Sequence, residues 1–238
     1  MSKGLRPDSR HFPKDFSILH EDDDILVVVK PSGLLTMGTE RDKTRTAYAM
    51  LTDYVRKGCA KSSKRIFIVH RLDRDTSGIL VFAKTPVAKT RLQGRWEETE
   101  KKYLAVVHGR CENKEGMIST YLAENAAHVV YSTPDHSKGK LARTAYRVLR
   151  DTREYSLLEV DLLTGRKHQI RVHLAGIGHP VVGDEKYGEG KKAYKRLALH
   201  ARSLSIIHPV SGRRLAFETE FPEYFSKLLG SEDQRHKR

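Results

Sequence analysis

The alternation of apolar and polar positions predicts a chain with more strands than helices. A helical period is confined to residues 46–57, 85–98 and 167–175. Short apolar runs bounded by turn residues indicate strands at 25–30, 66–69, 79–82, 103–108, 117–122, 145–149, 156–163, 204–207 and 215–219. Because most of these strands follow one another through short connections, the predicted fold class is α+β, with a mixed, largely antiparallel β-sheet and flanking helices and loops.

The same pattern predicts one large domain. Residues 1–15 are polar and contain proline, so we expect a flexible N-terminal segment. The polar residues 231–238 are expected to form a disordered tail. No linker divides residues 16–230, which we therefore interpret as a single domain.

One connection is too polar for an ordinary hairpin. The nine residues HRLDRDTSG lie between the predicted strands 66–69 and 79–82, whereas hairpin turns usually need two to five residues. Asp73 and Asp75 stand beside Arg71 and Arg74, so both carboxylates should stay ionised. An ionised and positioned carboxylate can act as a nucleophile or a base. The structural alternative is an Asp-capped turn with surface ion pairs.

The charge of the chain indicates a polyanionic partner. Lys and Arg total 44 against 30 Asp and Glu, a formal net charge of +14. Such a surplus produces a field that attracts nucleic acid. An anionic membrane is less favoured, because no basic amphipathic helix is present. No run has transmembrane length and the N-terminus lacks a signal peptide, so a cytoplasmic protein without a membrane partner is expected.

A second polar segment, LTGRKHQIRVH at residues 163–173, combines cations with a predicted helix. Arg171 and His168 share the side of this helix opposite its apolar face, with Arg166 and Lys167 in the first turn. Cations at a helix N-terminus oppose the helix dipole. A phosphate, or an internal carboxylate such as Asp73, would offset that cost. A solvated basic face is the alternative.

Other motifs limit the chemistry. The chain has no Walker-type loop, no dinucleotide-binding GxGxxG and no GxSxG elbow. His168 and His173 are five residues apart, on different helix faces, and the two cysteines have no metal-ligand spacing, so no metal site is predicted. Tyr103 could stack on a base splayed out of RNA, although a tyrosine opening a strand is more often a core residue. The segment GHPVVGDEKYG at 178–188 indicates only a fixed loop path.

Taken in order, these segments resemble the RluA-type family of pseudouridine synthases. The resemblance runs from about residue 18 to residue 221 and includes an HRLDxxTSG motif with a downstream TGRxHQxRVH. The matching segments are KPSG (30–33), HRLDRDTSG (70–78), KKYLAVVHG (101–109), LTGRKHQIRVHL (163–174), GHPVVGDEKYG (178–188) and LALHA (197–201), the last followed by His208-Pro209.

The resemblance implies a fold, a reaction and residue roles. The fold would be that of pseudouridine synthases, with a central RNA-binding cleft. Such an enzyme isomerises uridine in ribosomal or transfer RNA without metal or cofactor. Asp73 would be the nucleophile, Arg171 its partner, and Tyr103 the residue that stacks on the base and takes the C5 proton. Arg71 would fill the space of the flipped nucleotide, and the remaining expected RNA-binding residues are Arg74, Thr76, Arg166, Lys167 and His168.

The sequence departs from the family pattern in two places. Many relatives carry an N-terminal S4-type RNA-binding domain, and the segment before Lys30 is too short for one, so we expect a stand-alone catalytic domain that acts as a monomer. Many relatives have a His soon after KPxG, where this chain reads LLTMG, and this weakens any role for that loop. Two alternatives remain at this stage: a non-catalytic RNA-binding module on the same fold, and a metal-dependent nuclease suggested by the twelve His and the basic charge.

Overall fold

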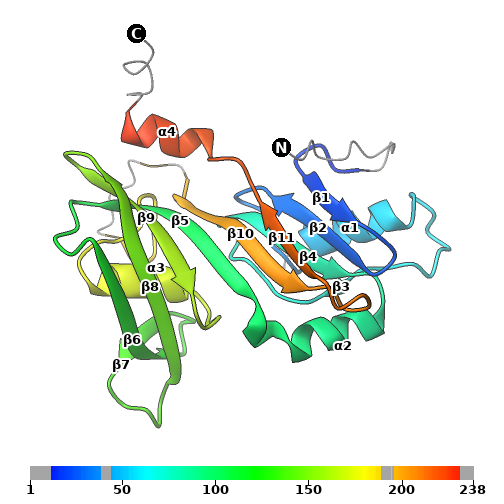
Figure 1. The fold of residues 1–238 in the computed structure, drawn as a ribbon, viewed down its shortest axis with the longest axis horizontal. Helices are drawn as coiled ribbons and strands as arrows, with labels where there is room; N and C mark the ends of the chain where they lie inside the picture. Colours follow the sequence, from blue (N-terminus) through cyan, green and yellow to red (C-terminus); the bar gives the residue numbers. More distant parts are fainter. Residues whose placement is uncertain (1–11, 39–43, 189–193, 195, 231–238) are drawn as a thin grey trace. The chain divides into compact units, whose positions relative to one another are not determined.

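The structure, a computed structural model, describes residues 12–38, 44–188, 194 and 196–230 (Figure 1). Its contacts divide the chain into two compact units, which are described separately. Unit 1 comprises residues 1–100 and 203–219, and unit 2 comprises residues 101–202 and 220–238. The single domain expected over residues 16–230 would contain both units and stays a prediction. The tail expected at 231–238, and all but residues 12–15 of the expected N-terminal segment, lie outside the described residues.

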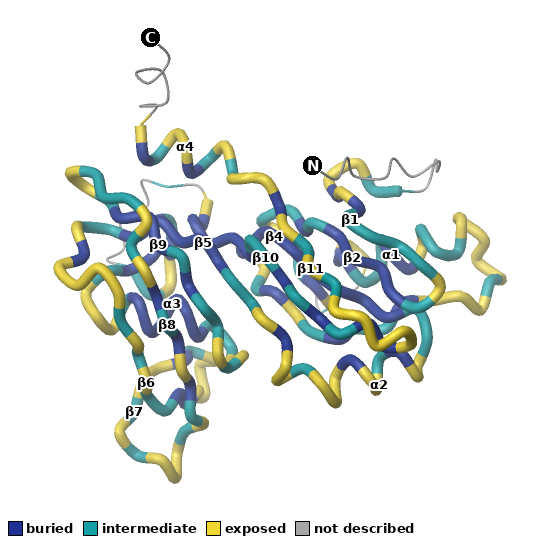
Figure 2. The backbone as a smooth tube through the Cα atoms, viewed as in Figure 1, coloured by how far each residue is buried: buried dark blue, intermediate teal, exposed yellow. Residues whose placement is uncertain are grey.

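Unit 1 is built on an antiparallel sheet. β2 (Ile25–Lys30) pairs with β1 (Ser17–Glu21) on one side and β4 (Ser77–Ala83) on the other. β3 (Phe67–Ile68) also pairs with β4, and the last part of β10 (Leu199–Ile207) pairs with β11 (Arg214–Glu218). Every residue of β4 is buried, and β2 and β4 form the dark centre of this unit in Figure 2. Apolar side chains from these strands and from α2 make its core.

The helices of unit 1 begin at side-chain caps. The Oγ1 atoms of Thr46 and Thr85 accept hydrogen bonds from the amides of Ala49 and Ala88, which start α1 (Ala47–Val55) and α2 (Pro86–Gly94). The sequence predicted a helix running towards Glu98. In the structure the α-helix ends at Gly94, and a separate 3₁₀ turn, η1 (Trp96–Glu98), follows it. The strand predicted at 66–69 shortens to the two residues of β3.

In unit 2 the strands pair antiparallel in the order β5-β9-β8-β6-β7. Its strands are β5 (Glu100–His108), β6 (Glu115–Glu124), β7 (Val130–Thr133), β8 (Lys140–Asp151) and β9 (Tyr155–Leu162). Val172 of α3 (Gln169–Gly176) packs with Leu122, Val130 and Ala142 of the sheet. The short helix α4 (Glu223–Leu229) completes the unit.

The start of α3 differs from the sequence prediction. The helix begins at Gln169, because His168 has a φ of 53° and so adopts the left-handed conformation as its N-cap. Arg166 and Lys167 therefore precede the helix, whereas the sequence predicted that they would lie in its first turn. In the part of the chain that the structure describes, no helix is long and apolar enough to cross a membrane.

Candidate active site

The loop at residues 70–78 of unit 1 presents Asp73 from a fixed backbone. Leu72 is buried, and both its amide and its carbonyl bind Oγ1 of Thr36, at 3.1 and 2.8 Å. After Asp73 the chain returns to the core at Thr76 and Ser77, which are also buried. Asp73 itself is half-buried. The carboxylate is thus held between two anchored points, as a reacting group requires.

The KPSG segment supports this loop through a buried ammonium group. Lys30 has no exposed surface, and its Nζ donates to the carbonyls of Pro31, Leu34 and Arg74 at 2.8, 2.7 and 3.0 Å. Ser32 adds a hydrogen bond from its hydroxyl to the carbonyl of Asp75, at 2.6 Å. A buried cation is tolerated only where it is paired or hydrogen-bonded. Lys30 therefore joins two chain segments that flank the carboxylate.

Replacing Lys30 by methionine is expected to destabilise the protein by about 2–4 kcal/mol, because three carbonyl oxygens lose their donor while the side-chain volume is nearly kept. Urea denaturation followed by circular dichroism measures the change. Lys14→Met is the matched control, since Lys14 is exposed in the same unit. Equal midpoints for the two variants would contradict the supporting role of Lys30.

The residues before the loop are fixed by aromatic packing. His70 stacks on Trp96 with 4.6 Å between ring centroids, and its Nε2 accepts a hydrogen bond from the amide of Val81 at 3.1 Å. The side chain of Gln93 donates to the carbonyl of Val69 at 3.2 Å. Arg71 and Arg74, on either side of Leu72 and Asp73, are exposed. The loop thus offers one half-buried carboxylate flanked by two exposed guanidinium groups.

In unit 2, Arg171 lies in a buried ion pair. Its Nε and Nη2 donate to the two carboxylate oxygens of Asp184, at 2.7 and 2.8 Å, and Asp184 has a side chain with no exposed surface. The amides of Lys186 and Tyr187 donate to Oδ1 of Asp184, each at 3.0 Å. Burial raises the pKa of Asp184, but the hydrogen bonds and charge of Arg171 outweigh it and lower the pKa below its usual value. The guanidinium is thereby fixed in orientation.

Tyr187 completes the surroundings of this pair. The guanidinium carbon of Arg171 lies 5.1 Å from the centre of the Tyr187 ring. The Tyr187 hydroxyl binds Nδ1 of His168 at 2.7 Å and accepts from the amide of Val130 at 3.1 Å. His168 is thus held by a tyrosine within unit 2, and its left-handed backbone brings it to that position before α3 begins.

The other residues predicted for unit 2 have local partners. Lys167 forms an ion pair with Glu124, and Nε of Arg166 donates to the carbonyl of Leu141 at 3.1 Å. Tyr103 lies on β5 opposite Val160 and is 8% exposed. Little of the Tyr103 side chain is therefore exposed.

His173 is a structural histidine with consequences for pH stability. Its ring nitrogens bind the hydroxyls of Thr120 and Thr144, at 3.0 and 2.9 Å, and it is 1% exposed. Burial lowers its pKa from 6.5 to about 4. The folded state therefore binds fewer protons than the unfolded state between these values, so stability is lost as the pH falls from 6.5 towards 4.

We expect the free energy of unfolding to fall by about 2–3 kcal/mol across this window through His173 alone. Urea titrations at a series of pH values measure it, and His173→Gln should flatten the slope between pH 6.5 and 4. An unchanged slope in that variant would show that His173 does not titrate there.

The structure thus distributes the predicted residues over both units. Unit 1 holds Asp73 together with Arg71, Arg74 and Thr76, and unit 2 holds Tyr103, Arg166, Lys167, His168 and Arg171. The predicted pairing of Asp73 with Arg171 would join the two units and stays a prediction. The sequence interpretation missed Lys30 and Asp184. Both lie in segments quoted for the resemblance, KPSG and GHPVVGDEKYG, to which no chemistry was given.

One group of metal-ligating side chains occurs among the described residues, at Asp22, Asp24 and His208 in unit 1. Nε2 of His208 lies 3.0 Å from Oδ2 of Asp22, while its Nδ1 accepts from the amides of Val210 and Ser211 at 3.3 and 3.0 Å. An imidazole whose Nδ1 accepts carries its proton on Nε2 and so lacks a lone pair there. The hydrogen bonds of this group therefore connect two turns, and His208 offers no free nitrogen lone pair to a metal.

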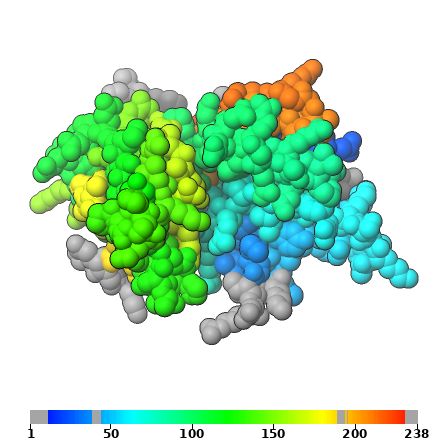
Figure 3. Space-filling view, turned by 90° about the horizontal axis from the view of Figure 1, so that it is seen from below, coloured from blue at the N-terminus to red at the C-terminus, as the bar shows by residue number. Residues whose placement is uncertain are grey.

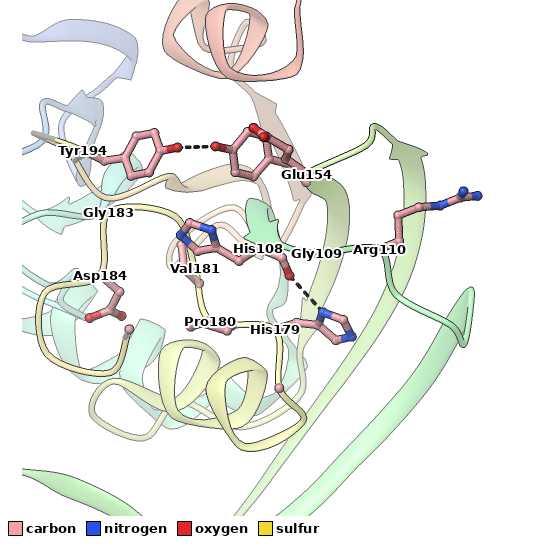
Figure 4. A pocket seen from close by; sticks show the side chains of 13 residues that line it. His108, Gly109, Arg110, Glu154, His179, Pro180, Val181, Gly183, Asp184 and Tyr194 are labelled. Atoms are coloured by element: carbon pink, nitrogen blue, oxygen red, sulfur yellow. Dashed lines mark hydrogen bonds between the residues drawn. The ribbon is translucent and has the colours of Figure 1, made fainter. Parts of the chain in front are cut away.

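A cavity of about 570 Å³ lies in unit 2, at the His108 end of β5 (Figure 4). His108, Tyr155 and Tyr194 contribute rings to its wall, and the carbonyl of His108 binds Nδ1 of His179 at 2.9 Å. None of the predicted catalytic residues Asp73, Tyr103 and Arg171 lines it, but Asp184, the partner of Arg171, does.

The chain is similar to known proteins over most of its length. Residues 24–176 match the family model described as RNA pseudouridylate synthase. The chain is 37% identical over 218 residues to the uncharacterized RNA pseudouridine synthase YhcT of Bacillus subtilis, covering 90% of this chain and 71% of that protein. It is 35% identical over 237 residues to ribosomal large subunit pseudouridine synthase D of Zymomonas mobilis, covering 91% and 73%.

Solved structures agree with these sequence matches. The human RNA pseudouridylate synthase domain containing 4 superposes with a TM-score of 0.74 at 25% identity, covering 87% of this chain and 89% of that chain. The human RNA pseudouridylate synthase domain containing 1 gives a TM-score of 0.70 at 27% identity, covering 92% and 87%. The expected fold class and the resemblance to pseudouridine synthases are confirmed.

Proposed function

Because the chain belongs to the RNA pseudouridylate synthase family, and is thus an isomerase that acts on RNA, we propose that it modifies uridines of ribosomal or transfer RNA with Asp73 as the catalytic carboxylate. The observation that carries the proposal is the fixed presentation of Asp73, between buried Leu72 and buried Thr76, on a loop supported by Lys30. A non-catalytic RNA-binding protein would have no need of Asp73, Tyr103 and Arg171 together.

The reaction rearranges bonds within one nucleotide. The N1–C1′ bond of uridine breaks, the detached uracil turns, and a C5–C1′ bond forms. The proton on C5 leaves and N1 gains a proton, so the product has the composition of the substrate. Asp73 acts on the ribose, either by attack at C1′ or by removal of the 2′ proton, and both routes require an ionised carboxylate. Tyr103 stacks on the uracil and takes the C5 proton, while Arg171 pairs with Asp73 and orients it.

The target must leave its stack to reach Asp73. Flipping a nucleotide costs a few kcal/mol, which contacts between cations and phosphates offset. Exposed Arg71 fills the space left in the RNA, and Arg74, Arg166, Lys167 and His168 contact its backbone. Thr76 is 2% exposed, so its contribution is to hold the loop. The proposal includes a monomeric, cytoplasmic enzyme that works without metal or cofactor.

The relatives guide the choice of substrate. The proteins from Zymomonas mobilis and Haemophilus influenzae are named ribosomal large subunit pseudouridine synthase D. We therefore place large-subunit ribosomal RNA first and transfer RNA second.

Tritium release tests the proposal. Transcripts of large-subunit ribosomal RNA and of transfer RNA, labelled with tritium at uracil C5, are incubated with the protein in EDTA. We expect tritium release to level off at a whole number of tritium equivalents per transcript. Pseudouridine should then be mapped at the same number of sites. No release from either RNA would overturn the proposal, and activity only without EDTA would favour metal chemistry.

A further inference from the structure

A short segment of unit 1 concentrates positive charge away from the site described above. Residues 56–65, RKGCAKSSKR, connect α1 to β3 and are here called the basic segment. In Figure 3 this segment is the cyan protrusion on the surface of unit 1. It contains no Asp or Glu, and its cations are Arg56, Lys57, Lys61, Lys64 and Arg65.

The basic segment is ordered by its own hydrogen bonds. Nε of Arg56 donates to the carbonyl of Lys64 at 2.9 Å, which closes the segment at its base. The amides of Cys59 and Ser62 donate to the carbonyls of Arg56 and Cys59, each at 3.0 Å. Gly58, with a φ of 69°, allows the chain to turn after α1. The segment therefore has a defined backbone path from which its cationic side chains extend.

Within the described residues, these cations have no carboxylate partner. None of the five forms an ion pair with another described residue, and Lys57, Lys61, Lys64 and Arg65 are exposed. The C-terminal end of α1 favours positive charge on Arg56 and Lys57 only, since the effect of the helix dipole fades within one turn. Among the others, Arg65 has its guanidinium carbon 4.8 Å from the centre of the Phe67 ring, whereas Lys61 and Lys64 add mutual repulsion. A polyanion would offset it.

The segment is rooted at the end of β4 opposite to the Asp73 loop. β3, which follows the segment, pairs Phe67 with Ala83, whereas the loop returns to β4 at Gly78, opposite Lys30. Five residues along a strand separate Gly78 from Ala83, a distance of about 17 Å. Cations based there would contact RNA several nucleotides away from the uridine at Asp73.

We propose that the basic segment binds the phosphate backbone of the substrate RNA outside the target nucleotide. This inference rests on the proposed function for its substrate but concerns affinity and not chemistry. Phosphate contacts position an RNA without reading its sequence. Loss of these cations should therefore raise KM and leave kcat unchanged.

Charge removal tests the inference. The triple variant Lys57→Gln, Lys61→Gln, Lys64→Gln should bind large-subunit ribosomal RNA about tenfold more weakly. The slope of the logarithm of its binding constant against the logarithm of salt concentration should be smaller in magnitude by about two. The matched control, Lys14→Gln, Lys89→Gln, Arg213→Gln, removes the same net charge elsewhere in unit 1 and should bind nearly as the wild type does. The corresponding three Lys→Arg substitutions in the segment should retain affinity.

Cys59 allows a direct second measurement. It is the exposed one of the two cysteines, and Cys111 is buried, so a maleimide-benzophenone reagent should label Cys59 alone. On irradiation the labelled protein should cross-link to RNA nucleotides near the modified uridine but not to that uridine, and Cys59→Ser should give no cross-link.

The outcomes separate this inference from the proposed function. Tritium release by the wild type, together with equal KM and equal salt slope for the two glutamine variants, would overturn the inference and leave the proposed function intact. If Cys59 cross-links to RNA and the segment variant binds RNA more weakly, but the wild type releases no tritium, the proposed function would be overturned and this inference would stand. Loss of kcat in the segment variant, with KM unchanged, would also contradict a role in binding.

Discussion

Replacing Asp73 by asparagine is expected to lower the rate of tritium release from labelled RNA by about 10⁴-fold or more. The amide has nearly the volume of the carboxylate but can neither attack C1′ nor accept a 2′ proton. Because Asp73 is half-buried between anchored neighbours, the variant should fold and bind RNA as the wild type does. Single-turnover kinetics and filter binding on the same RNA separate the two effects.

Asp75 offers the matched control for this experiment. It lies two residues away in the same loop, its side chain is exposed, and its main-chain carbonyl accepts the hydrogen bond from Ser32. Asp75→Asn should therefore release tritium at a rate close to that of the wild type. A reversed result, with Asp75→Asn inactive and Asp73→Asn active, would assign the chemistry to the other carboxylate.

The fold was predictable where burial follows a simple period. The strand at 25–30 has the predicted bounds because its apolar run is continuous and Pro31 stops it. β1, β7 and α4 were missed. The sequences SILHE and VYST are short and mix polar with apolar residues, and EYFSKLL spans less than two helical periods. Their structure depends on partners that pair with them in the folded chain, which local pattern does not reveal.

The candidate site was predictable where polar residues crowd one loop, as in HRLDRDTSG. Lys30 was missed because lysine is almost never fully buried, and only the three converging carbonyls make it possible here. The conformation of His168 was equally hidden, since a non-glycine residue at positive φ has no clear sequence signal.

Asp184 was missed for a different reason. It comes from a loop whose glycine and proline content indicates backbone path and not charge. A Cβ atom at Gly183, where φ is 77°, would lie 2.1 Å from the carbonyl oxygen of Arg196, so only glycine fits before Asp184. The signal that could have found it is Arg171 itself, because a guanidinium in a largely apolar helix requires a buried carboxylate.

Removing the carboxylate from the pair of Arg171 and Asp184 is expected to cost about 3–5 kcal/mol, the usual cost of deleting one member of a buried ion pair. In Asp184→Leu the guanidinium stays buried and loses both hydrogen bonds. For a chain of this length the midpoint of thermal unfolding should fall by about 10 °C. Glu223→Gln, in the exposed pair with Lys227 of the same unit, is the control and should leave the midpoint unchanged.

The double variant Arg171→Met, Asp184→Leu distinguishes an ion pair from simple packing. Removing both charges should recover part of the stability that Asp184→Leu loses, since the buried guanidinium that lost this carboxylate is then absent as well. The pH dependence gives a second signature. The folded-state pKa of Asp184 is lowered, so its contribution is present above the unfolded value of 3.8 and is lost as the pH falls below it. Asp184→Leu should lack that acid transition. If the double variant were less stable than Asp184→Leu, Arg171 would be held by contacts other than this carboxylate.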